Sequence, residues 1–264
     1  MKIDLSNKHA VVTGSTLGIG FAIAKGLAES GARVVINGRT EAAVKKAKEK
    51  LQAEVPGAQV DAVAGDLSSA EGVEKFLKAV PQTDILVNNL GIFEPKPFEE
   101  IPDADWQRYF ETNVMSGIRL SRAYVGGMRK KNWGRIIFIS SESGLNTPGE
   151  MVHYGVTKTA QLAVSRGLAV SLAGTGVTVN SVLPGPTRSE GVSDFFGKIA
   201  KEQGVAQEKI EKDFIATHRS TSIIKRLATV DEVANMVVYI ASPQASATTG
   251  AALRVDGGVV HTIA

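Results

Sequence analysis

Apolar residues along the chain gather in short runs rich in Val and Ile, and each run precedes a longer segment with apolar residues at helical spacing. Runs such as ILVNN (residues 85–89) and IIFIS (136–140) show little alternation of apolar and polar positions, which is typical of strands covered by helices on both faces. The pattern therefore predicts an α/β fold built on a doubly wound parallel sheet. The predicted strands are His9–Thr13, Arg33–Asn37, Gln59–Ala64, Asp84–Asn88, Arg135–Ser140, Val177–Leu183 and Ala251–Val255. The predicted helices are Gly18–Ser30, Glu41–Glu54, Ser69–Val80, Asp103–Lys131, Tyr154–Ala173 and Val230–Ala241.

One segment interrupts this alternation. No repeat or linker divides the chain, so we expect a single domain over residues 1–264. At about residues 189–227 the expected strand is replaced by an apolar and charged stretch long enough for two short helices outside the sheet. Ligands bind beyond the carboxyl ends of strands in open α/β sheets, and this stretch follows one such end. We predict a lid over the substrate, while a surface excursion or a subunit contact stays open as the alternative.

Composition excludes several classes of protein. Hydrophobic residues make up 43% of the chain and charged residues 22%, which suits a chain that buries a core. No apolar run is long enough to span a bilayer, and the N-terminus lacks the features of a secretory signal. Cysteine is absent, so disulfides, thiolate metal sites and cysteine nucleophiles are excluded. We expect a cytoplasmic protein that does not associate with membranes.

Charge and histidine patterns argue against nucleic-acid binding and against a metal site. The net charge is +3, but Lys and Arg are interleaved with Asp and Glu on predicted helix surfaces, as in residues 42–54. Such a mixture is typical of a solvated face rather than of a nucleic-acid interface. The four histidines are scattered and show no metal-ligand spacing, so we expect no metal.

A glycine-rich turn, TGSTLGIG (residues 13–20), joins the first predicted strand to the first predicted helix. Glycines permit a tight turn and let the backbone approach a bulky anion. The helix that follows offers unpaired N–H groups and the positive end of its dipole. The turn therefore predicts a site for the pyrophosphate of a dinucleotide, although glycines of this kind also serve turn geometry alone. The expected contacts are Gly14, Ser15, Thr16, Gly18 and Ile19.

Further motifs follow this turn in a fixed order. They are Asn88-Asn89-Leu90-Gly91 after the fourth strand, Asn113 in the next helix, Ser141 after the fifth strand, YGVTK (residues 154–158), and NSVLPG (180–185) after the sixth strand. With these motifs the chain resembles the short-chain dehydrogenase/reductase family from about Leu5 to Gly258, and in particular its 3-oxoacyl-[acyl-carrier-protein] reductases. The resemblance implies an NAD(P)-dependent oxidoreductase that moves a hydride between a nicotinamide and a carbonyl or secondary alcohol. It also implies a Rossmann-type sheet of about seven strands, in the order 3-2-1-4-5-6-7.

The candidate catalytic residues make chemical sense on their own. Tyr154 and Lys158 are four residues apart, so on a helix they share one face. A free tyrosine has a pKa near 10, and lowering it by roughly 2 to 3 units requires about 3–4 kcal/mol of preference for the phenolate. A nearby ammonium and a positively charged nicotinamide favour that ionised form. Tyr154 is thus the expected general acid or base, and Ser141 the group that polarises the substrate oxygen.

The resemblance implies the remaining contacts. Lys158 would also hold the nicotinamide ribose, and Asn113 would position a water that relays protons to Lys158. The other implied cofactor contacts are Asp66, Leu67, Asn89, Gly91, Tyr154, Pro184, Gly185 and Thr187. Leu90 departs from the usual Ala of the family, and Ser189 replaces a usual Thr.

The end of the second strand bears on the choice of cofactor. An acidic residue there would bind the ribose 2′-hydroxyl and repel a 2′-phosphate. This chain has Asn37, Gly38 and Arg39 instead, with no carboxylate before Glu41. Asn37 and Arg39 are both expected cofactor contacts. Arg39 is placed to pair with a 2′-phosphate, so we predict a preference for NADP(H), with NAD(H) also open. A surface arginine at the start of a helix is the other interpretation of Arg39.

The substrate is less well defined. Segments expected to border the pocket carry Phe93, Glu142, Ser143, Met151, Phe195 and Phe196, which suggest a partly apolar cleft and a ketone or 3-oxoacyl substrate. A non-catalytic NADP-binding sensor or scaffold of the same fold is the alternative, although such proteins typically lose the Tyr or the Lys. A hydrolase is disfavoured because no GxSxG motif is present. We also expect a homo-oligomer, a dimer or tetramer, formed through the two longest helices and the C-terminal segment.

Overall fold

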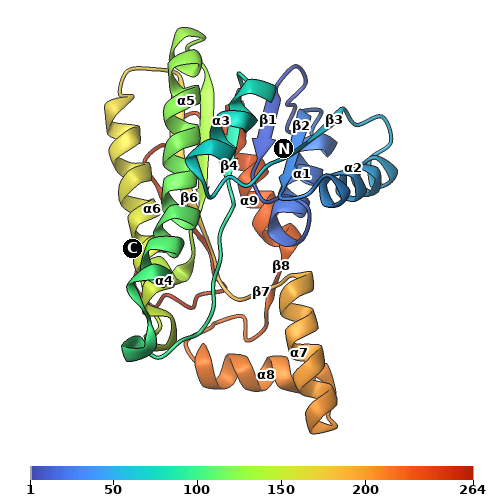
Figure 1. The fold of residues 1–264 in the computed structure, drawn as a ribbon, viewed down its shortest axis with the longest axis vertical. Coiled ribbons are helices and arrows are strands. Elements are labelled where there is room, and N and C mark those ends of the chain that lie inside the picture. The colour runs from blue at the N-terminus through green and yellow to red at the C-terminus, as the bar shows by residue number, and fades with distance from the viewer. Residues whose placement is uncertain (1, 264) are drawn as a thin grey trace.

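The computed structural model describes residues 2–263 and contains a seven-stranded parallel sheet (Figure 1). Its strand order is β3-β2-β1-β4-β5-β6-β9, which confirms the predicted order because β9 is the seventh strand of this sheet. Within the described residues two further short strands, β7 and β8, pair with each other outside it. The sheet strands are β1 (His9–Val12), β2 (Arg33–Gly38), β3 (Val60–Ala64), β4 (Ile85–Asn88), β5 (Gly134–Ile139), β6 (Val177–Pro184) and β9 (Ala252–Val255).

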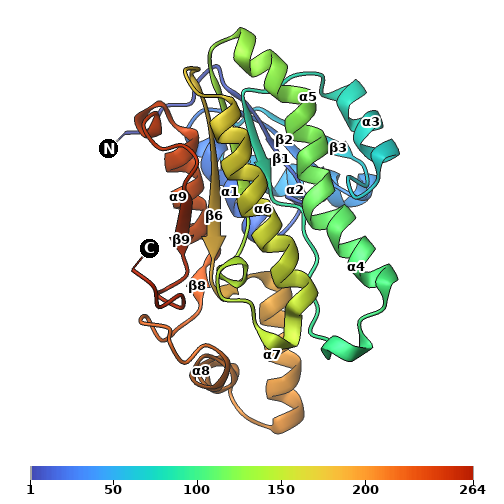
Figure 2. The same ribbon diagram turned by 90° about the vertical axis from the view of Figure 1, so that its left-hand side faces the viewer.

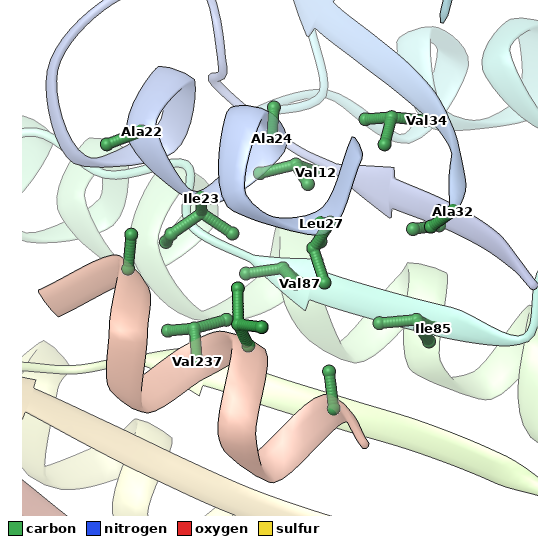
Figure 3. Packing of buried hydrophobic residues seen from close by; sticks show 14 of the residues in the cluster. Val12, Ala22, Ile23, Ala24, Leu27, Ala32, Val34, Ile85, Val87 and Val237 are labelled. Atoms are coloured by element: carbon green, nitrogen blue, oxygen red, sulfur yellow. The ribbon is translucent and has the colours of Figure 1, made fainter. Parts of the chain in front are cut away.

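Helices cover both faces of the sheet. On one face α1 (Gly18–Glu29), α2 (Glu41–Glu54) and α9 (Val230–Ala241) share a core with alternate strand residues, and Figure 3 shows part of this packing between α1, α9, β1 and β4. On the other face lie α3 (Ala70–Ala79), α5 (Ser116–Lys130) and α6 (Val152–Ser171). Val11 belongs to the second core and Val12 to the first, because successive strand residues point to opposite faces.

The segment predicted as one helix from Asp103 to Lys131 is divided. It begins as α4 (Asp103–Phe110), passes through a π-helical turn (Glu111–Met115) and continues as α5. Such turns contain one extra residue and are frequent at functional sites. Asn113 lies at the centre of this turn. Short 3₁₀ turns occur at Phe98–Glu100, Glu142–Gly144, Gly149–Met151 and Pro243–Ala245.

The predicted insertion forms two helices beside the sheet, as expected. Helices α7 (Glu190–Gln203) and α8 (Gln207–His218) extend below the sheet in Figures 1 and 2 and pack on each other around a small core of their own. Ser189 caps the start of α7, and Gly204 ends it in a left-handed conformation that glycine adopts without strain. The strands β7 (Thr187–Arg188) and β8 (Ala228–Thr229) pair where the insertion leaves the sheet and returns.

This topology determines where a ligand can bind. The chain moves outward from β1 to β2 and β3, then crosses to β4 on the other side of β1. In such sheets ligands bind at the carboxyl ends of the strands where the order reverses. The loops after β1 and β4 meet at this point. Among residues 2–263, no helix combines the length and apolar character that a membrane span requires.

Candidate active site

The turn between β1 and α1 is shaped for close approach of a backbone to an anion. Gly14 and Gly18 both have a φ of +59°, a region that favours glycine. A side-chain carbon on Gly20 would lie 2.4 Å from the carbonyl oxygen of Gly14, so this position also requires glycine. The N-cap residue of α1, Leu17, provides no side-chain cap for the helix. These features fit a dinucleotide pyrophosphate at the start of α1.

Neighbouring polar side chains hold this turn in place. The Asn89 amide donates to the carbonyl oxygens of Thr13 and Gly14, at 2.9 and 3.0 Å. Asn37 accepts from the Gly14 N–H and donates to the carbonyl oxygens of Val63 in β3 and of Gly65 just after it. The Ser15 hydroxyl donates to the carbonyl oxygen of Val12. Asn37 and Ser15 are almost completely buried. Their side chains are therefore used inside the protein, and both act as braces of the turn.

The other expected cofactor residues lie on loops at the same edge of the sheet. Arg39 and Asp66 are exposed after β2 and β3, whereas the Leu67 side chain is buried in the core. Thr16 and Ile19 are half-buried in the glycine turn. The Thr187 hydroxyl donates to the carbonyl oxygen of Gly185, at 2.8 Å, just after Pro184 ends β6.

Tyr154 and Lys158 share a face of α6, as the spacing predicts. Lys158 Nζ lies 5.4 Å from the centre of the Tyr154 ring. The phenol is half-buried, and burial raises the pKa of Tyr154 while a hydrogen bond with Ser141 lowers it. Ser141 follows β5 directly, so the end of that strand and the start of α6 bring the hydroxyl and the phenol together.

Lys158 is buried beside the loop that follows β4. Its ammonium group donates to the carbonyl oxygen of Ile139, at 2.9 Å, and burial lowers the pKa of Lys158 to about 7. A side-chain carbon on Gly91 would come within 3.5 Å of Lys158 Nζ and of Asn113 Oδ1, so the absence of a side chain there keeps this space open. Gly91 thus lies beside both Lys158 and Asn113, as a shared cofactor cleft requires.

A buried glutamine, Gln161, links Asn113 to Lys158 and was not predicted from the sequence. Gln161 Nε2 donates to the backbone carbonyl oxygen of Asn113, at 2.6 Å, and Gln161 Oε1 lies 3.3 Å from Lys158 Nζ. The Asn113 amide itself bonds both backbone groups of Ile92 and the Thr157 hydroxyl. Gln161 therefore connects the π-helical turn to Lys158 directly. Residues 154, 158 and 161 fall on one helix face, which was the available signal.

A charged pair lies next to Ser141. Glu142 is buried, and its carboxylate accepts from the hydroxyl of Ser141 and from the N–H of Ser143, the latter at 2.9 Å. Arg219, at the end of α8, reaches the other oxygen of Glu142 with its Nε, at 3.1 Å, and contacts Glu150 at 3.4 Å. The sequence pointed to Glu142 as a pocket residue, but Arg219 is 77 residues away and only the fold reveals the pair.

Of the aromatic residues expected to border the pocket, only Phe93 contacts Tyr154, whereas Phe195 and Phe196 lie on α7. Phe93 is exposed and its ring contacts the ring of Tyr154 edge-on, with centroids 6.1 Å apart. Phe196 instead packs inside the core shared by α7 and α8, while Phe195 points to the surface. A pocket of about 210 Å³ beside Arg219 has mostly polar lining, with Pro148 and Val259 as its apolar members. The lining of this pocket is polar because the insertion contributes Arg219, Ser220 and Thr221 to it.

The insertion also touches the glycine turn. Glu190, the first residue of α7, accepts a hydrogen bond from the N–H of Gly18 at 2.8 Å. A carboxylate thus occupies the start of α1, the place where an anionic ligand is expected. In residues 2–263 we find no group of three acidic or histidine side chains that would hold a metal ion.

Comparisons with known proteins show what the whole chain is similar to. A family model described as enoyl-(acyl carrier protein) reductase matches residues 14–260. The uncharacterized oxidoreductase YvaG of Bacillus subtilis is 47% identical over 263 residues and covers 100% of both chains. A 3-oxoacyl-[acyl-carrier-protein] reductase of Aquifex aeolicus is 32% identical over 263 residues, which is 98% of this chain and 100% of the relative. The crystal structure of L-sorbose reductase from Gluconobacter frateurii, complexed with NADPH and L-sorbose, aligns over 100% of both chains with a TM-score of 0.94 and 33% identity.

Proposed function

The chain belongs to the short-chain dehydrogenase/reductase family and is a nicotinamide-dependent oxidoreductase, and from this premise we propose that it reduces a ketone or 3-oxoacyl compound with NADPH. The observation that carries the proposal is the position of the Lys158 ammonium group, 5.4 Å from the centre of the Tyr154 ring, with Ser141 beside the phenol. The order of the motifs around these residues along the chain supports the same chemistry.

The roles of the side chains follow from their surroundings. When bound, the nicotinamide supplies the hydride to a carbonyl carbon or receives it from an alcohol. Tyr154 donates its phenolic proton to the carbonyl oxygen, and in the reverse direction it accepts the proton of the alcohol. Burial raises the pKa of Tyr154, so the free enzyme keeps this proton available at neutral pH. Ser141 donates to the same oxygen, and a protonated Lys158 favours the phenolate that remains.

Residues around the strand ends would hold the cofactor. Gly14, Thr16, Gly18 and Ile19 lie at the N-terminus of α1, where they would meet a pyrophosphate, and Lys158 would bind the nicotinamide ribose. Asp66 and Leu67, with Asn89 and Gly91, would adjoin the adenosine, and Pro184, Gly185 and Thr187 the carboxamide. Ser15 and Asn37 support this site through the turn that they brace.

We propose NADP(H) as the preferred cofactor. Arg39 is exposed just beyond β2, and no carboxylate precedes Glu41 there, so a 2′-phosphate would meet a guanidinium without repulsion. The NADPH in the L-sorbose reductase structure supports this choice. We further propose that residues 189–227 form a lid, supported by the contacts of Glu190 with Gly18 and of Arg219 with Glu142.

The test is NADPH consumption against a panel of ketones and 3-oxoacyl thioesters. We expect turnover by the wild-type enzyme and a loss of at least 100-fold in kcat for Tyr154→Phe, since general acid catalysis contributes about 10²- to 10⁴-fold. Tyr239→Phe, which removes a phenol hydroxyl from α9, is the matched control and should keep wild-type turnover. Wild-type rates in Tyr154→Phe would overturn the catalytic assignment. NADPH binding without turnover of any carbonyl compound would favour a sensor or scaffold.

We also propose assembly as a homodimer or homotetramer through α4, α5 and α6. Phe110, Val156 and Val170 on these helices are 42%, 45% and 62% exposed in the isolated chain. Burial of such side chains against a second copy would remove apolar surface from water. Light scattering after size-exclusion chromatography tests this, and the mass of one chain would contradict it.

A further inference from the structure

The environment of Glu142 is unusual because a buried carboxylate adjoins the hydroxyl that the proposed reaction needs. Glu142 is 5% exposed. One carboxylate oxygen, Oε2, accepts from the Ser141 hydroxyl, from the Ser143 N–H at 2.9 Å and from the Ser143 hydroxyl at 3.2 Å. The other oxygen, Oε1, accepts from Arg219 Nε at 3.1 Å. All of these donors belong to the protein itself.

The Ser141 hydroxyl cannot serve two acceptors at once. It has one proton, which it gives to Glu142 Oε2 in this structure. If Ser141 turns that proton toward a carbonyl oxygen of the substrate, Oε2 loses a donor. A buried charged group that loses a hydrogen bond is destabilised, so the best substrate replaces the missing donor. A hydroxyl on the carbon next to the carbonyl is within reach, since Oε2 is one hydrogen bond away from Ser141 Oγ.

The local charge restricts the substrate further. Arg219 contacts both Glu142 and Glu150, so these three side chains together carry one net negative charge. A guanidinium already held by two carboxylates has little to offer a substrate carboxylate, which Glu142 and Glu150 would repel. The pocket beside Arg219 presents Asn146, Ser220 and Thr221, polar groups that suit hydroxyls better than an acyl chain.

We propose that Glu142, held by Arg219, is the specificity-determining residue for an uncharged ketone that carries a hydroxyl on the carbon adjacent to its carbonyl. This inference rests on the proposed function, because it assumes that Ser141 and Tyr154 act on the carbonyl oxygen. Glu142 binds the adjacent hydroxyl as an acceptor and thereby releases Ser141 for that oxygen. Sites built to hydrogen-bond a substrate hydroxyl discriminate strongly against the analogue that lacks it.

The experiment compares three small substrates with NADPH in the wild-type enzyme. They are hydroxyacetone, butanone, which lacks the hydroxyl, and pyruvate, which replaces the hydroxymethyl group by a carboxylate. We expect kcat/KM for hydroxyacetone to exceed that for butanone by about 100-fold and that for pyruvate by more. Because this comparison uses no variant, it does not depend on whether a substituted protein folds.

Two variants identify the residue responsible. Glu142→Leu should reduce kcat/KM for hydroxyacetone at least 10-fold and change the value for butanone much less, so that the preference falls from about 100-fold to about 10-fold or less. Glu150→Gln removes one charge from the same cluster without touching Ser141, and it should keep the hydroxyl preference while reducing discrimination against pyruvate. Preservation of the hydroxyl preference in folded Glu142→Leu would overturn the proposal.

The outcomes distinguish a failure of the inference about Glu142 from a failure of the proposed function. Equal kcat/KM for hydroxyacetone and butanone in the wild-type enzyme would refute the inference about Glu142, while the proposed function as a ketone reductase would still hold. Bound NADPH with no turnover of these ketones or of 3-oxoacyl thioesters would refute the proposed function, and the inference with it. Preferential turnover of 3-oxoacyl thioesters would support the proposed oxidoreductase function and refute the proposed preference for a hydroxyketone.

Discussion

Glu190 at the start of α7 should weaken cofactor binding in the wild-type protein, and replacing it by Gln should strengthen that binding. Its carboxylate accepts a hydrogen bond from the Gly18 N–H at 2.8 Å, at the N-terminus of α1. The proposed cofactor places its pyrophosphate at the same helix end, so the carboxylate competes with it and repels it. Glutamine keeps the size of the side chain but removes the charge.

The size of this effect follows from the exposure of the group. The Glu190 side chain is 47% exposed, and Lys50 lies 3.9 Å away, so solvent and a cation screen the charge. Two unit charges about 4 Å apart interact by about 1 kcal/mol in water, and a charge at an exposed helix terminus contributes about 0.3–1 kcal/mol. The sum is about 1–2 kcal/mol, which corresponds to roughly a 5- to 30-fold lower Kd.

Fluorescence titration of NADPH measures this Kd at low salt and again at about 0.5 M salt, where screening should reduce the difference between wild type and Glu190→Gln. Glu202→Gln is the matched control, because it removes the same charge from an exposed position of α7. A Kd that is unchanged or higher in Glu190→Gln would refute the reasoning. A higher value would show that the carboxylate helps to form the cofactor site.

Three further changes test other parts of the site. Gln161→Leu leaves the buried carbonyl oxygen of Asn113 without its donor, so urea unfolding should report a loss of about 1–3 kcal/mol, and an unchanged stability would contradict the linking role. The pKa of Lys158 is about 7 in the folded protein, against an ordinary 10.5. At pH values between these two, Lys158 is protonated in the unfolded chain and largely neutral in the folded protein. The free energy of unfolding should therefore rise with pH across this interval, by up to about 1.4 kcal/mol per pH unit, and Lys158→Met should lose this slope. Arg39→Asp should lower the ratio of kcat/KM for NADPH to that for NADH by at least about 10-fold, because a charge-assisted contact with phosphate is lost and repulsion is added; an unaltered ratio would reject the cofactor assignment.

Much of the fold could be predicted from local patterns of apolar and polar residues in the sequence. Residues 85–87 and 136–139 are apolar without alternation because helices cover both faces of β4 and β5, and this signal is visible in the sequence. The π-helical turn at Glu111–Met115 is not visible, because the helical pattern continues through it. The turn is fixed by distant contacts instead, including the Gln161 amide on the Asn113 carbonyl oxygen.

The site divides in the same way. Tyr154 and Lys158 could be paired from their spacing on one helix, and Ser141 from its place at a strand end. The inward orientation of the Asn37 amide could not be predicted from the sequence, because it depends on the carbonyl groups of Val63 and Gly65 on the neighbouring strand and loop. Arg219 was equally hidden, since its partner Glu142 is brought near only when the insertion folds back on the sheet.

The separate core of α7 and α8 has a consequence for how such a protein can diversify. Phe196, Ala200, Ile210, Ile215 and Leu227 cluster with one another rather than with the two cores that flank the sheet. Substitutions among these five residues therefore do not alter the two cores that pack against the sheet. Evolution, or an engineer who grafts residues 189–227 from a relative, can therefore change the pocket beside Arg219 while the sheet keeps its packing, provided that Glu190 and Arg219 keep their contacts with Gly18 and Glu142.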